Sequence, residues 1–228
     1  MNDIKQLESL LAARMPVVAV ESHEEAKVIG MMENFASLNE RTFFLWSVTG
    51  GLKRYNSRDS IYNTTEFIAA LRHVEASPVN AVYLFLDAHP FIDDPVAVRI
   101  IKNISSKAEV VPRMLVFLSH AIKLPAELVP LSANFQPSLP DAAAIQTILN
   151  EEASRYRRSS GDKVQASREA LHMMVQHLNG LTEESIRRLI RMAIGDDGRI
   201  TLGDIGKLLK SKHETMQGCD VLSFEPVS

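Results

Sequence analysis

One aspartate of the sequence stands where a carboxylate could act on a bound metal ion. Asp87 directly follows the apolar run 82–86, and Ala88 and His89 come next. An aspartate at the end of a buried strand can hold Mg²⁺ on the phosphates of a nucleotide, and other groups must then position and polarise the attacking water. A glutamate beside the aspartate would serve, but that residue is Ala88, so we predict no water activation here. The alternative is a strand-terminal aspartate that caps the following turn.

No glycine-rich phosphate loop accompanies Asp87. Such a loop has the spacing Gly-x-x-x-x-Gly-Lys-Ser/Thr, because backbone N–H groups must cradle the phosphates and a lysine must reach them. This spacing occurs nowhere in the 228 residues. Gly50, Gly51 and Lys53 are suitable residue types at the wrong spacing, and we interpret them as a turn.

Serine–histidine pairs also follow two of the apolar runs. Ser119-His120 follows residues 114–118, and Ser22-His23 lies just after residues 17–20. Together with Asp87 they could form a nucleophile system, which makes a small α/β enzyme one alternative hypothesis. No Gly-x-Ser-x-Gly nucleophile elbow supports it. His89 has no cysteine or histidine cluster around it in the sequence, so we predict no metal site.

Arginines gather in the last third of the chain: Arg155, Arg157, Arg158, Arg187, Arg188 and Arg191. Arg187 and Arg191 share one helical face, where like charges four residues apart repel by a few tenths of a kcal/mol unless a partner neutralises them. Arginine suits interfaces because its planar fork pairs with carboxylates. We therefore predict an interface here, and little change in thermal stability when Arg187 and Arg191 are reversed to glutamate. Solvated surface is the alternative.

The elements that would position these residues alternate in the first half of the chain. Five short runs are candidate strands: residues 17–20, 42–46, 82–86, 114–118 and, more weakly, 132–135. Nearly unbroken apolar runs are typical of strands buried on both faces of a parallel sheet. Ser22, Thr64 and Asp94 are the expected N-caps of the intervening helices. This alternation predicts an α/β layer with a five-stranded, mainly parallel sheet.

The pattern changes near residues 136–140, where only helical periodicity continues. Expected helices begin at Asp141, Ser167, Thr182 and Thr201. We predict a helical unit without strands in residues 141–212. The expected domains are thus an α/β domain (1–138), a helical domain (139–215) and a linker (216–228) to a missing downstream module, in which residues 221–224 could add an edge strand.

Composition narrows the classes of function. Hydrophobic residues make up 46%, charged residues 23%, and the formal charge is −3. A near-neutral chain with 6% aromatic residues does not favour nucleic-acid binding. Apolar runs are too short to cross a bilayer, no secretory signal opens the chain, and a single cysteine suits a reducing compartment. We therefore expect a cytoplasmic protein.

The layout of an α/β domain followed by a helical unit is similar to an AAA+ ATPase module, a P-loop NTPase-type fold with a helical lid. In that resemblance Asp87 matches the Walker B aspartate, Ser119 the polar sensor 1 residue and Arg188 a sensor 2 arginine. The segment from Leu124 to Leu128, Leu-Pro-Ala-Glu-Leu, is similar to the one that follows sensor 1. The resemblance implies ATP and Mg²⁺ for a parent ATPase. Without Walker A and the Walker B glutamate, this chain alone is expected to be inactive.

A closer resemblance covers nearly the whole chain. The run Arg14-Met15-Pro16-Val17, the helix start Ser22-His23-Glu24-Glu25 and the turn from Gly180 to Arg188 resemble, in order, an uncharacterised two-module AAA ATPase family of cyanobacteria, plastids and other bacteria. Its first module is degenerate, and its second carries the Walker motifs. The resemblance implies a non-catalytic module for assembly, partner docking or regulation of that second module, or for self-association. A clamp-loader-type subunit is the alternative, which the neutral charge disfavours.

Overall fold

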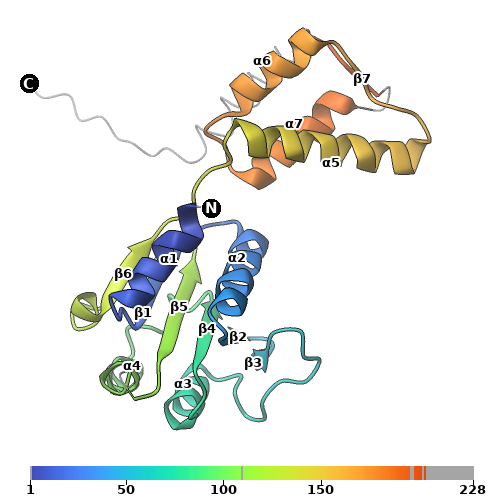
Figure 1. The fold of residues 1–228 in the computed structure, drawn as a ribbon. Coiled ribbons are helices and arrows are strands. Elements are labelled where there is room, and N and C mark those ends of the chain that lie inside the picture. Colours follow the sequence, from blue (N-terminus) through green and yellow to red (C-terminus); the bar gives the residue numbers. More distant parts are fainter. Residues whose placement is uncertain (1, 109, 196–197, 202, 204–228) are drawn as a thin grey trace, which may run out of the picture. The chain divides into compact units, whose positions relative to one another are not determined.

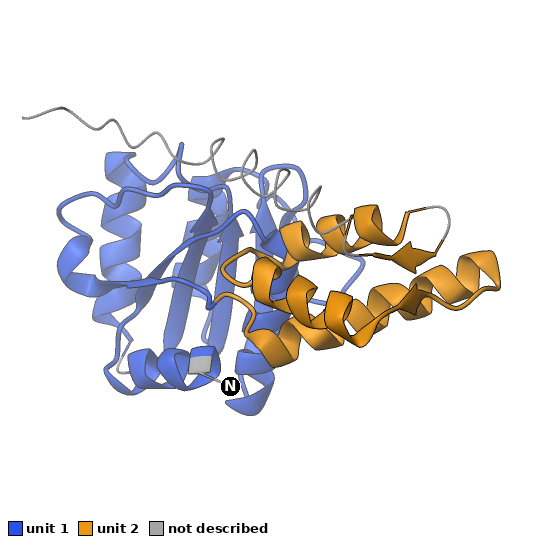
Figure 2. Cartoon of the chain, turned by 90° about the horizontal axis from the view of Figure 1, so that it is seen from above, with its two compact units in different colours: residues 1–138 blue, residues 139–228 orange. Residues whose placement is uncertain are grey.

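The computed structural model describes residues 2–108, 110–195, 198–201 and 203 (Figure 1). The chain divides into two compact units, Met1–Ser138 and Leu139–Ser228 (Figure 2). Each unit has its own apolar core, so each is described by itself.

Unit 1 is built on a six-stranded sheet with the order β3-β2-β4-β5-β1-β6. Its strands are β1 (Val17–Glu21), β2 (Thr42–Ser47), β3 (Gly51–Arg54), β4 (Ala81–Leu86), β5 (Arg113–Ser119) and β6 (Ser132–Phe135). All neighbours are parallel except β2 and β3. The predicted mainly parallel α/β sheet is confirmed.

The expected number of strands was too low by one, because β3 was interpreted as part of a turn. Gly50 does lie in the turn, where its N–H donates to the Ser47 carbonyl at 3.2 Å. Gly51, with φ +64°, then begins the short edge strand that pairs with β2. Only Leu52 of this strand has a buried large side chain, so four residues gave too little apolar signal.

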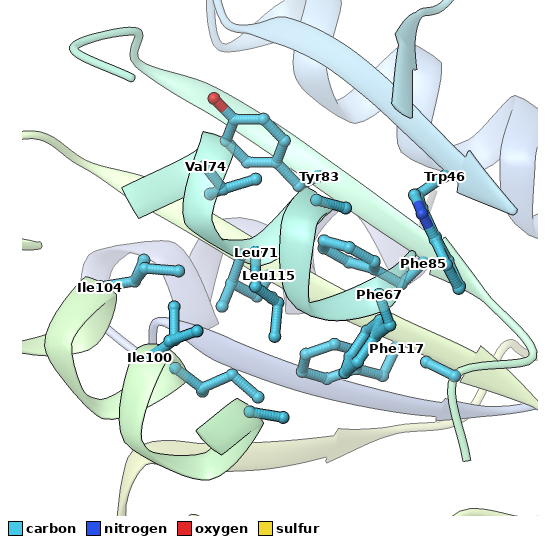
Figure 3. Packing of buried hydrophobic residues seen from close by; sticks show 14 of the residues in the cluster. Trp46, Phe67, Leu71, Val74, Tyr83, Phe85, Ile100, Ile104, Leu115 and Phe117 are labelled. Atoms are coloured by element: carbon cyan, nitrogen blue, oxygen red, sulfur yellow. The ribbon is translucent and has the colours of Figure 1, made fainter. Parts of the chain in front are cut away.

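Helices cover both faces of the sheet because side chains alternate along the buried strands. Val82 and Leu84 of β4 pack with α1 (Asn2–Ala12) and α2 (Glu25–Leu38). Tyr83 and Phe85 face α3 (Phe67–Ala76) and α4 (Pro95–Ser106). Figure 3 shows this second face, where Trp46, Phe67, Phe85 and Phe117 pack ring against ring. Burying each such side chain contributes about 1.5–3 kcal/mol.

The helix starts of unit 1 confirm one predicted cap and correct two. Asp94 caps α4, since its Oδ1 accepts from the Val96 and Ala97 N–H groups at 2.7 and 3.3 Å. Ser22 instead accepts from the N–H of Glu24, and α2 begins at Glu25. Thr64 is buried and bonds outside the helix, because its Oγ1 accepts from the Leu52 N–H at 2.9 Å and donates to the Ile61 carbonyl at 2.6 Å.

Unit 2 is mainly helical, with α5 (Ala142–Ser160), α6 (Arg168–Leu178) and α7 (Glu183–Ile194). The three predicted caps are confirmed: Asp141, Ser167 and Thr182 each accept from the backbone N–H three residues on. In unit 1, a 3₁₀ turn, η1 (Val129–Leu131), precedes β6.

The prediction of no strands after residue 141 is wrong at one place. Strands β7 (Gln165–Ala166) and β8 (Arg199–Ile200) pair in parallel. With two residues in each strand, the sequence cannot show the alternation of apolar and polar residues that predicts a strand. Of the expected helix after Thr201 only Gly203 is described, and it is helical. The possible edge strand 221–224 and the linker 216–228 lie outside the described residues.

Candidate functional site

The carboxyl ends of the neighbouring strands β4, β5 and β1 lie side by side, and the segments that follow β1 and β4 turn to opposite faces of the sheet. Strand β1 leads to α2 on one face, whereas β4 leads to α4 on the other. Ligands of open α/β sheets bind at such points, outside the carboxyl ends of the strands. Glu21 and Ser119 are register partners here, and the Asp87 N–H donates to the Leu118 carbonyl at 2.9 Å. The structure therefore brings together the predicted residues Asp87 and Ser119.

A hollow of about 250 Å³ lies at these strand ends, and we call it the strand-end hollow. It is lined by Ser22, His23, Glu25, Leu86, Asp87, Leu118, Ser119 and His120. Pockets for small-molecule ligands usually measure roughly 300–1,000 Å³. The lining includes two carboxylates and neither lysine nor arginine. The hollow is thus somewhat smaller than most such pockets, and the phosphates of a nucleotide would find no lysine or arginine among its described lining residues.

The turn from β1 into α2 uses its own polar groups. The Ser22 N–H donates to the Ser119 carbonyl at 2.9 Å, and the Glu24 N–H to the Ser22 Oγ at 3.0 Å. Glu21 Oε1 accepts from the Ile122 N–H at 3.0 Å. Two backbone donors of the turn are thus already bonded, where a phosphate loop would present them to a ligand.

Gly50 and Gly51 do not form a phosphate-binding loop at the strand-end hollow. Gly50 and Gly51 lie in the β2–β3 hairpin, and Lys53 lies on β3. In the sheet order, β4 and β5 stand between β2 and β1. The interpretation of these residues as a turn is therefore confirmed for Gly50 and corrected for Gly51 and Lys53, which belong to β3.

Asp87 is exposed and has a left-handed backbone with φ +50°. Aspartate is one of the few residues besides glycine that adopt this conformation readily. The neighbouring Ala88 is fully buried among the apolar residues that face α3 and α4. The methyl group of Ala88 therefore offers no hydrogen bond to a water beside Asp87.

Ser119 is held by a histidine that the sequence did not pair with it. Ser119 Oγ lies 2.7 Å from His89 Nδ1, but 3.5 Å from His120 Nδ1. Its side chain is only 2% exposed, a poor position for a nucleophile. The Ser119–His120 pair considered from the sequence is therefore replaced by Ser119–His89.

Three imidazoles gather at the strand ends. The ring centroids of His89 and His120 lie 5.0 Å apart, and those of His23 and His120 lie 6.0 Å apart in a stacked arrangement. Sequence reasoning missed this cluster, although each histidine lies one to three residues after a strand. No group of three possible ligands among the described residues has a geometry that could hold a metal ion.

In unit 2, Arg187 and Arg191 both bind the carboxylate of Glu152. Arg187 Nη1 donates to Glu152 Oε1 at 3.1 Å, and Arg191 Nε donates to Glu152 Oε2 at 2.8 Å. Arg187 also pairs with Glu151 and Glu183 at 2.8 Å. The two arginines therefore find neutralising carboxylates within the same chain, which removes the charge argument for an interface here. The interface itself stays a prediction.

The ion pairs of this network govern the protonation of Glu152, which is 4% exposed. Hydrogen bonds from Arg191 and then from Arg187 lower the pKa of Glu152, against the opposing effect of burial. Burial disfavours the charged form of Arg187, but hydrogen bonds to Glu151, Glu183 and Glu152 outweigh it and raise its pKa. The side chains of Arg155, Arg158 and Arg188 are exposed.

Comparison with known proteins assigns both units. Residues 3–136 match the N-terminal domain of SpoVK-like AAA ATPases, and residues 143–218 match their second domain. The chain belongs to the SpoVK-like AAA ATPase family. This confirms the resemblance to an AAA ATPase family that the sequence motifs indicated.

Curated relatives of the chain include uncharacterised AAA domain-containing proteins named ycf46. The protein of Trieres chinensis is 24% identical over 96% of this chain and 43% of its own length. The protein of Guillardia theta is 22% identical over 98% of this chain and 44% of its own length. The chain thus spans less than half the length of these relatives.

Solved structures with the same fold include AAA domains. The FIGL-1 AAA domain has a TM-score of 0.53 at 13% identity and covers 96% of this chain and 82% of its own. A Thermotoga maritima RuvB variant has a TM-score of 0.56 at 15% identity, covering 92% and 68%. At these identities the likeness shows the fold alone. Among the described residues, no helix is long and apolar enough to span a bilayer.

Proposed function

We propose that this chain is a non-catalytic AAA+-like module that serves assembly, partner docking or regulation of a catalytic AAA ATPase module. The observation that carries the proposal is the β1–α2 turn. Here Glu21-Ser22-His23-Glu24 stands in place of a phosphate loop, and its side chains and carbonyl partners bond the backbone donors of the turn.

The remaining positions of a nucleotide site support this assignment. Asp87 is a vestigial Walker B residue beside the buried Ala88, and Ser119, at the sensor 1 position, is bonded to His89. Arg188 stands at the sensor 2 position. The chain therefore needs no bound cofactor, whereas ATP and Mg²⁺ belong to the catalytic module of the parent ATPase.

A docking role fits the partial span of the chain. Its curated relatives are about twice as long, so the remaining length can carry a catalytic module. One structural neighbour comes from an E. coli HORMA:CdnC:Trip13 complex, which shows that the fold can be part of a protein assembly. We place this work in the cytoplasm, with a protein rather than a nucleic acid as the partner.

The exposed arginines of α5 are the best candidates for the contact. Arg155 lines a hollow of about 240 Å³ together with Arg191, and Arg158 lies three residues further along the helix. Arg187 and Arg191 remain interface candidates as well. A partner could contact only the part of each guanidinium group that stays exposed to solvent beside the internal ion pairs.

Sedimentation velocity of the chain, alone and with a catalytic SpoVK-like ATPase module, tests the proposal. Reversing Arg155 and Arg158 to glutamate should weaken association. A glutamate at these positions would repel a carboxylate of the partner, with which an arginine can form a bidentate pair. Reversing the exposed Arg54 and Arg58 of unit 1 is the matched control and should leave association unchanged. No association of the unmodified chain, with itself or with the module, would refute the docking role.

A further inference from the structure

A second hollow lies at the opposite ends of the strands, where β1 and β5 begin. It measures about 220 Å³ and is lined by three arginines, Arg14, Arg41 and Arg113, and by apolar residues. We call it the arginine hollow. Because β1 and β5 are parallel, this hollow lies a full strand length from the strand-end hollow, roughly 16–23 Å at about 3.3 Å per residue.

The positive charge that a ligand of the arginine hollow could meet is that of Arg41. Arg14 has an interaction partner of its own, and no aspartate or glutamate is among the described lining residues. The side chain of Arg41 donates to the Pro112 carbonyl at 3.1 Å, and within the described chain it forms no ion pair with a carboxylate. Burial lowers the pKa of Arg41 from its usual value, as expected for a partly desolvated cation without a counter-charge.

Arg113 adds a second incompletely satisfied cation. It is 5% exposed, and its Nη1 donates to the Glu75 carbonyl at the end of α3 at 3.2 Å. Its Nε has no hydrogen-bond partner among the described residues. Strand alternation directs the Arg113 side chain to the α3 and α4 face, so its charge adds positive potential to the hollow without pairing directly with a ligand there.

The apolar part of the hollow indicates what kind of anion fits. Six of its nine described lining residues are apolar, among them Leu11, Met15 and Met114. Val110, in the loop that leads to β5, is 84% exposed. A free phosphate is hydrated on all sides and gains little from apolar walls, whereas an acidic side chain on a peptide brings apolar neighbours with it.

We propose that the arginine hollow docks a short segment of a partner protein in which acidic residues alternate with apolar ones. A glutamate or aspartate carboxylate of the partner pairs with the Arg41 guanidinium, and a neighbouring apolar side chain enters the hollow. A volume of about 220 Å³ is below the usual range of small-molecule pockets, roughly 300–1,000 Å³, and suits one or two side chains.

The test measures fluorescence anisotropy of a capped, dye-labelled peptide in which glutamate alternates with leucine. We expect saturable binding that weakens with salt. Arg41→Gln should weaken it roughly tenfold, because a charge-assisted pair is lost. Arg41→Lys keeps the charge without the planar fork, so its peptide affinity should lie between those of the unmodified chain and Arg41→Gln. Arg99→Gln removes an exposed arginine of α4 outside the hollow, and should stay within about twofold of the unmodified chain.

Three results would overturn the proposal. The first is equal binding by the unmodified chain and both Arg41 variants, with thermal unfolding showing that the variants are folded. The second is equal binding of a peptide in which glutamine replaces glutamate. The third is binding of inorganic phosphate at the hollow, lost in Arg41→Gln, without any binding of the acidic peptide, since the ligand would then be a small oxyanion.

Discussion

At the residue scale, the most consequential contact is the one between Glu152 and its two arginines. Arg187 and Arg191 are the pair that the sequence suggested as an interface, because sequence spacing shows which residues share a helix face. It does not show that a glutamate 35 residues earlier lies opposite them. The near-complete burial of Glu152 was equally hidden, since it lies on a polar-looking helix.

Glu152→Gln should lower the free energy of unfolding of unit 2 by about 1–3 kcal/mol, because two guanidinium groups lose their shared carboxylate. The half-exposed side chain of Arg191 keeps the loss at the lower end, since water can replace part of the contact. Glu151→Gln is the matched control and should cost less than about 1 kcal/mol, because Glu151 is 53% exposed. Urea unfolding of both variants is the measurement, and equal effects would contradict the argument.

The same contact predicts a pH dependence. The pKa of Glu152 is lowered in the folded chain, so its ion pairs contribute stability above the unfolded value of about 4.3. That contribution is lost as the pH falls through the folded value. The stability difference between the unmodified chain and Glu152→Gln should therefore shrink steadily below about pH 4. Urea unfolding across this pH range measures it, and a constant difference would show that the carboxylate charge does not matter.

At the element scale, the candidate site depends on strands that the sequence predicted well. The runs that became β1, β4 and β5 are buried on both faces over most of their length, and such continuous apolar runs are the clearest signal in the chain. Asp87 and Ser119 could thus be placed at one edge of the sheet from sequence. The histidine cluster could not, because the loops after the strands set its geometry.

Short elements carried too little signal. The edge strand β3 and the pair β7–β8 have four and two residues per strand, so apolar alternation cannot emerge. Thr64 shows a related limit: it precedes α3 and has the residue type of a cap, but its hydroxyl is recruited by the buried N–H of Leu52.

Thr64→Ala should lower the free energy of unfolding of unit 1 by about 1–3 kcal/mol, because the Leu52 N–H is left buried without an acceptor. Thr65→Ala is the neighbouring control at an exposed position and should stay within about 0.5 kcal/mol. Thermal unfolding compares the two. A loss no larger for Thr64→Ala than for the control would mean that water replaces the hydroxyl.

At the scale of the whole molecule, the two units have separate cores. Unit 1 packs its apolar residues on the two faces of the sheet, and unit 2 packs its own among α5, α6 and α7. A fragment of residues 1–140 should therefore fold alone and unfold in one cooperative transition. Circular dichroism during heating measures this. A fragment without a cooperative transition would show that unit 2 is needed to complete the core.

The central claim, that this module does not hydrolyse ATP, is tested most directly by multiple-turnover phosphate release from ATP and Mg²⁺ with the purified chain. The β1–α2 turn lacks a phosphate cradle and Ala88 stands beside Asp87, so release should equal the protein-free blank. Asp87→Ala should then change nothing. Phosphate release that requires the chain and disappears in Asp87→Ala would contradict the account, because it would show that Asp87 serves a working catalytic site.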